Sequence, residues 1–398
     1  MIDKNVSPQK MVSLFAGIGG FELAFRSIGV ETTLMCEIDE VAKHVLSTNI
    51  PNVPIAKDVC TLEELPSDTD ILCAGFPCQD LSSVGGKKGL SGTRSSLVKE
   101  VFRLLHTHKT EWVVFENVSF MLSLNNGEAI RTIVEGLEQL GYNWAYRTLD
   151  SISFVPQHRC RVFVIATLHH DPREVILSDE TIEDVCKVDY GEFKKPIGFY
   201  WTEGKYALGM ISDGIPTLKA GSTIGIPSPP AIAFPDGEVS IPDIRDAERL
   251  QGFPANWTKP AQDVARSSIR WRLVGNAVTV DTVAWIAKKI KSPHPYNSNA
   301  DQPITFSAKK KNWPKAAWGI NGERFESKVS KFPIKRSQVS LTDFLLYPRK
   351  SLSLKAITGF ENRLSTGKMN SPKYFRETIH NHKLLMEQNY GRNYQDII

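Results

Sequence analysis

The sequence lacks metal-binding cysteine pairs, internal repeats, low-complexity tracts and long apolar runs. Its six cysteines form no C-x-x-C pair, which argues against a zinc site, and we expect no bound metal. There is no signal peptide and no apolar stretch long enough to span a bilayer. We therefore expect a cytoplasmic protein that contacts no membrane and keeps its thiols reduced.

Negative charge is scarce toward the C-terminus. From Tyr296 onward the chain has 18 Lys+Arg and 8 Asp+Glu, a net charge of +10, whereas the preceding residues carry −6. A basic segment suggests a polyanion partner. Its aromatic residues and a predicted helix from Tyr374 to Glu387 indicate a folded extension, for which packing on the rest of the chain or contact with a partner protein are the alternatives. With 398 residues, 41% of them hydrophobic, the chain can form more than one domain.

A glycine turn follows the first apolar run. The run 11–15, the turn 16–20 and the apolar residues 21–25 predict a strand, a turn and a helix in sequence. Such a turn lets the backbone approach a nucleotide-like ligand. The turn has neither G-x-G-x-x-G spacing nor a P-loop lysine, which argues against a dinucleotide pyrophosphate or a nucleoside triphosphate as the ligand.

Two carboxylates follow at the ends of the next predicted strands. Glu37 comes twenty residues after Gly17, an offset at which an acidic residue can bind a ribose hydroxyl. Asp58 follows a third strand, where it could bind an adenine amino group. Each alone is as well explained as a surface charge, but together with the turn they suggest an S-adenosylmethionine site.

Cys78 follows the buried run 71–74 and lies in a turn, Gly75 to Gln79, at the carboxyl end of a predicted strand. Open α/β sheets place their reactive groups at this edge. We therefore interpret Cys78 as a nucleophile, and a structural cysteine near a tight turn is the alternative.

Six sequence blocks extend this interpretation. In order, they are Phe15-Ala16-Gly17-Ile18-Gly19-Gly20, Gly75-Phe76-Pro77-Cys78-Gln79, Phe115-Glu116-Asn117-Val118, Gln157-His158-Arg159-Cys160-Arg161, Arg249-Leu250-Gln251-Gly252-Phe253-Pro254 and Gly275-Asn276-Ala277-Val278. This ordered set resembles the motifs of DNA cytosine-5 methyltransferases. The resemblance covers about residues 10 to 290, and it is loose between the fourth and fifth blocks.

The resemblance assigns catalytic roles. Cys78 would add to C6 of cytosine, so that C5 can attack a sulfonium methyl group. Glu116 would face N3 and the exocyclic amine, and Arg161 would hold O2. Arg159 and Arg161 would supply the positive potential that ionises Cys78. A helix-capping Glu116 and arginines on an exposed strand edge are the structural alternatives.

The resemblance also assigns the cofactor contacts. Turn chemistry is the alternative for Asn276, and a helix from Val278 to Ile290 is expected to pack beside the glycine turn. The expected cofactor residues are Phe15, Gly17, Gly19, Gly20, Glu37, Asp58, Pro77, Leu97 and Asn276.

Two segments are expected to contact DNA. The Gly-, Ser- and Lys-rich stretch after Cys78 has the composition of a mobile lid that could close on phosphates around a flipped base. The Pro- and Gly-rich middle segment corresponds to the region in which the family reads its target. The candidate DNA-binding residues are Ser82, Lys87, Lys88, Arg94, Thr217, Lys219, Ser222 and Thr223, and loop residues without contact to DNA are the alternative.

Together these patterns predict an α/β protein with a Rossmann-like S-adenosylmethionine-dependent methyltransferase domain. We expect a first catalytic part at 1–167, a target recognition domain at 168–244, a closing catalytic part at 245–293 and a basic C-terminal extension at 294–398, α+β or mostly helical. The expected activity is methylation of C5 of cytosine in a specific double-stranded DNA sequence, by a monomer that modifies DNA beside a separate restriction endonuclease. An RNA cytosine-5 methyltransferase of the same fold and a catalytically silent DNA-binding regulator are the alternatives.

Overall fold

The computed structural model describes residues 9–77, 97–181, 188–189, 191–203, 208–221, 228–304, 313–336, 339–367 and 369–395. The chain forms two compact units, each built from three separate stretches. Unit 1 consists of Met1–Asp150, Cys160–Ile182 and Ala277–Lys335, and unit 2 consists of Ser151–Arg159, Glu183–Asn276 and Arg336–Ile398. The residues of the expected C-terminal extension are therefore divided between the two units.

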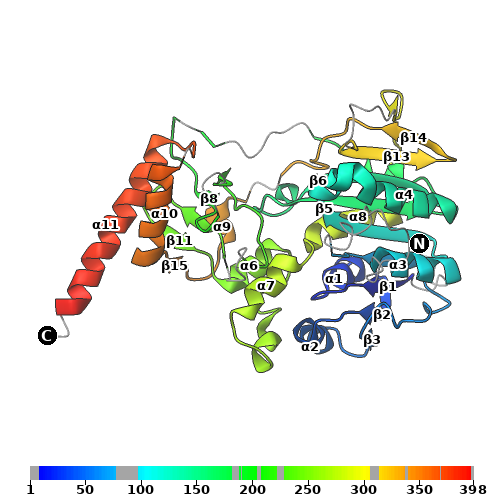
Figure 1. The fold of residues 1–398 in the computed structure, drawn as a ribbon, viewed down its shortest axis with the longest axis horizontal. Coiled ribbons are helices and arrows are strands. Elements are labelled where there is room, and N and C mark those ends of the chain that lie inside the picture. The colour runs from blue at the N-terminus through cyan, green and yellow to red at the C-terminus, as the bar shows by residue number, and fades with distance from the viewer. Residues whose placement is uncertain are drawn as a thin grey trace, which may run out of the picture. The chain divides into compact units, whose positions relative to one another are not determined.

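Unit 1 is organised around a ten-stranded sheet with the strand order β12-β14-β13-β6-β7-β5-β4-β1-β2-β3 (Figure 1). Neighbouring strands from β5 to β3 are parallel, and the pairs from β5 to β12 are antiparallel. The strands are β1 (Lys10–Leu14), β2 (Glu31–Cys36), β3 (Ile55–Ala56), β4 (Ile71–Ala74), β5 (Trp112–Val118), β6 (Asn143–Asp150), β7 (Cys160–Thr167), β12 (Gln302–Pro303), β13 (Ala316–Ile320) and β14 (Glu323–Glu326).

Helices cover both faces of this sheet because successive side chains of a strand point to opposite faces. Val12 and Leu14 of β1 belong to the main apolar core, together with Val101 of α3 and Ile133 of α4. The intervening Ser13 faces the other side, where α1 and α8 pack against each other. The helices of unit 1 are α1 (Gly20–Arg26), α2 (Glu40–Asn49), α3 (Leu97–Thr107), η2 (Ser119–Leu122), η3 (Leu124–Gly127), α4 (Glu128–Gln139), α5 (Arg173–Ile176) and α8 (Val280–Lys291).

Several predicted elements are present in the structure. The expected strand, turn and helix at 11–25 are confirmed by β1 and α1, and the expected helix 278–290 is confirmed by α8, which contacts α1. β5 continues past Glu116 to Val118, so Glu116 lies inside a strand and not at its end.

The segment that follows α8 adds strands to the antiparallel side of the sheet. β13 pairs with β6, and the Trp313 ring contacts Trp144 and Tyr146 of β6. Gly319 lies against the Trp144 ring so closely that a Cβ atom there would come within 2.5 Å of it. Only glycine fits this position without moving the indole.

Unit 2 contains a five-stranded sheet with the order β15-β11-β10-β8-β9, in which each described pairing is antiparallel. Its strands are β8 (Ile197–Phe199), β9 (Ile211–Ser212), β10 (Ala231–Ala233), β11 (Val239–Ile241) and β15 (Lys350–Ser351). Its helices are η4 (Ser151–Ser153), α6 (Ile244–Leu250), η5 (Lys259–Asp263), α7 (Ile269–Asn276), α9 (Leu341–Phe344), α10 (Leu354–Thr366) and α11 (Lys373–Gln395).

The last two helices form part of the core of unit 2. Phe360 of α10 and Phe375 of α11 are buried, and each ring centroid lies 5.0 Å from that of Phe199 in β8. α10 and α11 lie side by side at the C-terminal end of the chain (Figure 1). The predicted helix 374–387 is confirmed by α11, and among the described residues no helix has the length and apolar character needed to cross a bilayer.

Replacement of Phe360 by alanine should destabilise unit 2 by about 3–5 kcal/mol, because it leaves a cavity between α10 and β8. Urea unfolding with hydrogen exchange of the β8–β11 amides measures the effect. Leu385→Ala is the control, since this α11 side chain is 50% exposed and its loss should change stability by less than about 0.5 kcal/mol. Equal effects of the two substitutions would mean that α10 is not part of the core.

Candidate active site

A left-handed turn connects β1 to α1. Phe15, Gly17 and Gly19 have φ angles of 57°, 59° and 93°. Glycine adopts such angles at little cost, whereas a phenylalanine is strained there. The Ala16 amide donates to the carbonyl of Cys36 at 3.0 Å, so the turn is attached to the end of β2.

Glu37 holds this turn in place. One carboxylate oxygen accepts a hydrogen bond from the Gly17 amide at 2.7 Å, and the other accepts one from the Asp39 amide at 2.8 Å. Burial raises the pKa of Glu37, and these hydrogen bonds oppose the shift. Each carboxylate oxygen can accept a second hydrogen bond, so the side chain could bind the turn and a ligand hydroxyl together.

The other expected cofactor residues of unit 1 lie near strand ends. Asp58 follows β3 and accepts a hydrogen bond from the Cys60 amide at 2.9 Å. Pro77 is exposed three residues after β4, and Leu97 is the first residue of α3 and packs against the main core. Asn276, the exposed last residue of α7, belongs to unit 2.

Glu116 and Arg161 form an ion pair between neighbouring strands. The Arg161 Nε lies 3.1 Å from Glu116 Oε1, and both side chains are about 15% exposed. Antiparallel pairing of β5 and β7, with Val118 opposite Arg161, brings the two side chains together. The pair combines a proton donor or acceptor with a fixed cation at one place, as expected for a polar ring ligand.

The chain leading to Cys78 approaches this pair. A Cβ atom on Gly75 would lie 3.6 Å from Glu116 Oε2. The buried Asn117 side chain donates to the Phe76 carbonyl at 2.9 Å and so fixes the backbone two residues before Cys78. The candidate residues that lie outside the described part of the chain are Cys78, Ser82, Lys87, Lys88, Arg94, Ser222 and Thr223.

Arg159 has different surroundings from Arg161. β7 begins at Cys160, so Arg159 precedes the strand, whereas Arg161 lies within it. Arg159 is 2% exposed and donates to the carbonyls of Leu218, at 2.8 Å, and Gly275, at 3.1 Å. These contacts fix a loop of unit 2.

The same loop is held by other side chains of unit 2. Gln157 accepts a hydrogen bond from the Leu218 amide at 2.8 Å, and Thr217 donates to the His158 carbonyl at 2.8 Å. The Lys219 Nζ atom lies 2.9 Å from Glu203 Oε1 and 4.0 Å from the ring centroid of Tyr200. The Lys219 ammonium is therefore oriented and partly exposed.

Gly275 lets this loop pass close to α7. A Cβ atom at position 275 would come within 2.2 Å of the Lys219 backbone, so any side chain there would displace the loop. This explains why the sixth sequence block begins with glycine.

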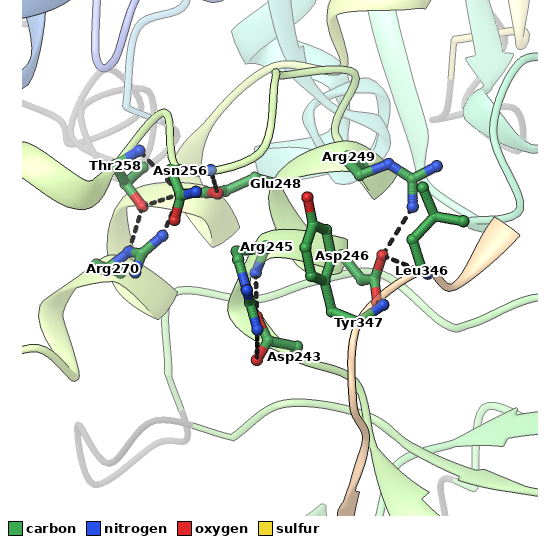
Figure 2. Close-up of polar contacts among 10 residues, drawn as sticks. All are labelled: Asp243, Arg245, Asp246, Glu248, Arg249, Asn256, Thr258, Arg270, Leu346 and Tyr347. Carbon is green, nitrogen blue, oxygen red and sulfur yellow. Dashed lines mark hydrogen bonds and ion pairs between the residues drawn. The ribbon is translucent and has the colours of Figure 1, made fainter.

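Two buried carboxylates of α6 accept hydrogen bonds from other segments of unit 2 (Figure 2). Glu248 accepts hydrogen bonds from the Asn256 amide at 2.6 Å, the Thr258 amide at 2.8 Å and Arg270 at 2.8 Å. Asp246 accepts from the amides of Leu346 and Tyr347 at 3.0 Å and from Arg249 at 2.7 Å. Glu248 thus fixes the chain between α6 and α7, and Asp246 fixes the C-terminal segment.

Glu22, on the first turn of α1, is a buried carboxyl in unit 1. Its side chain is directed toward Ser13 of β1 and Cys73 of β4, and the residue is 2% exposed. Neither carboxylate oxygen makes a hydrogen bond of normal geometry with a described residue. Burial raises the pKa of Glu22 to about 7, although the Ser13 hydroxyl and the Glu22 amide partly oppose the shift.

The sequence matches the family of C-5 cytosine-specific DNA methylases over residues 9–200. The chain is 43% identical over 368 residues to the Type II methyltransferase M2.BsuMI of Bacillus subtilis strain 168, which covers 89% of this chain and 92% of the relative. The chain belongs to the C-5 cytosine-specific DNA methylases. The predicted enzyme class is therefore confirmed.

Another Type II methyltransferase and two solved structures are also similar to this chain. The Type II methyltransferase M.MspI of Moraxella sp. is 30% identical over 72% of each chain. The S. pombe Dnmt2 methyltransferase has a TM-score of 0.54 at 18% identity, over 71% of the methylase and 98% of its own chain. The Entamoeba histolytica methyltransferase EhMeth has a TM-score of 0.51 at 16% identity, over 72% and 100%. These structures confirm the predicted Rossmann-like fold.

Three polar residues of the methylase were not predicted as site residues. Asn117 and Gln157 lie inside recognised sequence blocks, and their position beside Glu116 and Arg159 is the signal that could have identified them. Glu22 had no such signal, because a glutamate on a short helix after a glycine turn ordinarily faces water.

Glu22→Gln should stabilise the methylase increasingly as the pH rises. A carboxyl whose pKa is higher in the folded than in the unfolded state contributes most to the free energy of unfolding below its unfolded-state pKa. This contribution is lost as the pH rises through about 7. The free energy of unfolding of Glu22→Gln minus that of the wild type should grow by about 2 kcal/mol between about pH 5 and about pH 8. Calorimetric unfolding measures it, with Glu31→Gln at the exposed start of β2 as the control. A pH-independent difference would contradict the buried, titrating carboxyl.

Proposed function

We propose that this methylase transfers a methyl group from S-adenosylmethionine to C5 of cytosine in a specific double-stranded DNA sequence, as the modification enzyme of a restriction-modification system. The observation that carries this proposal is the Glu116–Arg161 pair beside the chain that leads to Cys78. The similarity to Type II methyltransferases supports the biological setting.

The turn between β1 and α1 has the features that S-adenosylmethionine requires. Its left-handed glycines leave the backbone free of side chains, and Glu37 keeps acceptor capacity for ribose hydroxyls. Glu37 and the turn residues 15–20 would hold the nucleoside, with Asp58, Pro77, Leu97 and Asn276 as the further contacts.

The bound cofactor supplies an electrophilic methyl group. Cys78, as a thiolate, forms a bond to C6 of cytosine, and the electron pair of the C5–C6 double bond becomes available at C5. After C5 has gained the methyl group, a base such as a water molecule takes the C5 proton, and the electron pair of that C–H bond restores the C5–C6 double bond and expels the Cys78 thiolate. Addition and elimination thus leave the cysteine unchanged.

Glu116 and Arg161 stabilise the ring during these steps. A proton shared between Glu116 and N3 offsets the negative charge that develops when the thiolate adds. Arg161 orients Glu116 through its Nε and directs other donors at the cytosine O2. Arg159 has a positioning role in this scheme, because it donates to backbone carbonyls of unit 2.

A base inside a duplex must leave the helix before a thiolate can reach it. Ser82, Lys87, Lys88 and Arg94 would close on phosphates around the flipped nucleotide. Thr217, Lys219, Ser222 and Thr223 would read the target, with Lys219 presented from the loop that Gln157 and Arg159 hold. A flipped base requires one active site, so a monomer can perform the reaction beside a separate nuclease.

Expression in a methylation-deficient host should produce modified cytosines confined to one short DNA motif, as measured by bisulfite sequencing. Cys78→Ala should abolish this modification and leave DNA binding intact, because only the nucleophile is lost. Modification that persists in the variant would refute the assignment of Cys78. If the wild type modifies no DNA, labelled methyl transfer to total RNA separates an RNA methyltransferase from a silent regulator.

Glu37→Ala should weaken S-adenosylmethionine binding roughly ten- to hundredfold, because it removes hydrogen bonds to a charged acceptor worth about 1.5–3 kcal/mol. DNA affinity should change much less. Calorimetry of cofactor binding measures the loss, and Glu37→Gln, which keeps one carbonyl acceptor, should lose less. Glu31→Ala, at the other end of β2, should bind as the wild type does. Unchanged cofactor affinity in Glu37→Ala would remove this residue from the site.

A further inference from the structure

The Glu22 carboxyl is a polar group to which the reaction scheme assigns no role. It lies on α1 two residues after Gly20, and both of its oxygens are buried without a hydrogen bond of normal geometry in the described structure. Helix α1 follows directly on the turn proposed to hold the cofactor, and the neighbouring Ser13 lies in β1, just before that turn. A carboxylate in such a place is costly unless a positive charge comes close.

The groups that face Glu22 supply no such charge. From β1 it meets the Ser13 hydroxyl, from β4 the Cys73 thiol, and from the end of β2 the Glu37 carboxylate, which raises its pKa further. The Cys73 thiol stays protonated, because burial raises its pKa well above the ordinary value. None of these neighbours is a cation.

The charged side chains of α8, the helix that packs on α1, interact with groups other than Glu22. Lys289 pairs with Asp179 at 2.6 Å, and Lys291 donates to the Ile28 carbonyl at 2.9 Å. Asp281 interacts with Lys288. Among the described residues, none of these four is a cause of the pKa shift of Glu22.

We propose that Glu22 is the residue by which the enzyme distinguishes its positively charged methyl donor from the uncharged thioether product, S-adenosylhomocysteine. The proposal rests on the proposed cofactor site at residues 15–20 and Glu37. A sulfonium held over the turn stabilises the Glu22 carboxylate through a medium of low dielectric constant. The thioether has no such charge, so it leaves the titration of Glu22 as it is in the free enzyme.

The coupling between proton binding and ligand binding predicts how the affinity for each ligand depends on pH. A ligand that favours the ionised carboxyl releases its proton on binding, and its affinity rises as the pH passes through the pKa of the free enzyme, about 7. S-adenosylmethionine binding should therefore strengthen with pH relative to S-adenosylhomocysteine binding. Since the two ligands share their adenosine and amino acid portions, contacts from Glu37 and Asp58 cancel in the ratio of their dissociation constants.

Isothermal titration calorimetry of the full chain with each ligand, at about pH 6 and about pH 8, tests this. In the wild type, the dissociation constant of S-adenosylhomocysteine divided by that of S-adenosylmethionine should rise about tenfold from the lower to the higher pH. This change is equivalent to about 1.4 kcal/mol of coupling. Repeating the titration near pH 7 in buffers of different ionisation enthalpy should show proton release with S-adenosylmethionine that is absent with S-adenosylhomocysteine. This buffer comparison needs no variant and so does not depend on the folding of one.

Variants locate the effect. Glu22→Gln, which keeps the shape of the side chain but cannot ionise, should make the ratio independent of pH. Ser13→Ala removes the hydroxyl that lowers the pKa of Glu22, so the rise should move to higher pH. Glu31→Gln, which removes an exposed carboxylate at the other end of β2, should behave as the wild type.

A ratio that is constant in the wild type, or that still rises in Glu22→Gln, would overturn the proposal. If both ligands bind and the ratio is constant, the cofactor site stands and only the role of Glu22 is lost. If neither ligand binds, the proposed cofactor is wrong, and the role of Glu22 is refuted with it.

Discussion

The hydrogen bond from the Gly17 amide to the Glu37 carboxylate is the contact on which the proposed cofactor site depends. It ties the left-handed turn after β1 to the end of β2, together with the hydrogen bond from the Ala16 amide to the Cys36 carbonyl. The neighbouring parallel strands β4 and β5 bring Gly75 to Glu116 at the same edge. The order of strands in the sheet thereby collects groups that are up to a hundred residues apart in the sequence.

Much of unit 1 could be predicted from the sequence because its signals are local. An apolar run that breaks at glycines and resumes with helical spacing specifies β1, the turn and α1, and the position of Glu37 follows from where β2 ends. The pairing of Glu116 with Arg161 could not be derived this way. It depends on the register between β5 and β7, which places Arg161 opposite Val118 and diagonally next to Glu116, and no sequence signal specifies that register.

The polar interior of unit 2 shows the limit of such inference more clearly. Arg159 and Asp246 are buried because backbone groups far away in the sequence satisfy them, and Glu248 is satisfied by amides of the chain that follows α6. A backbone group has no side chain that would identify it as a partner, so the sequence does not indicate that these charged residues are buried. The charge of the basic extension suggested a polyanion partner and its aromatic residues suggested a folded segment, and apolar residues such as Phe360 and Phe375 do form part of the core of unit 2.

The assembly of unit 2 from three stretches sets an order of events during protein synthesis. β11 is complete at Ile241, but its edge partner β15 begins at Lys350 and the helix that covers the sheet begins at Lys373. At roughly 5–20 residues per second, the ribosome leaves that strand edge and the apolar face unprotected for on the order of ten seconds. An unpaired edge invites association with other chains. The nascent enzyme therefore passes through a period in which chaperone binding competes with aggregation, and unit 2 is complete only after the last helix has been made.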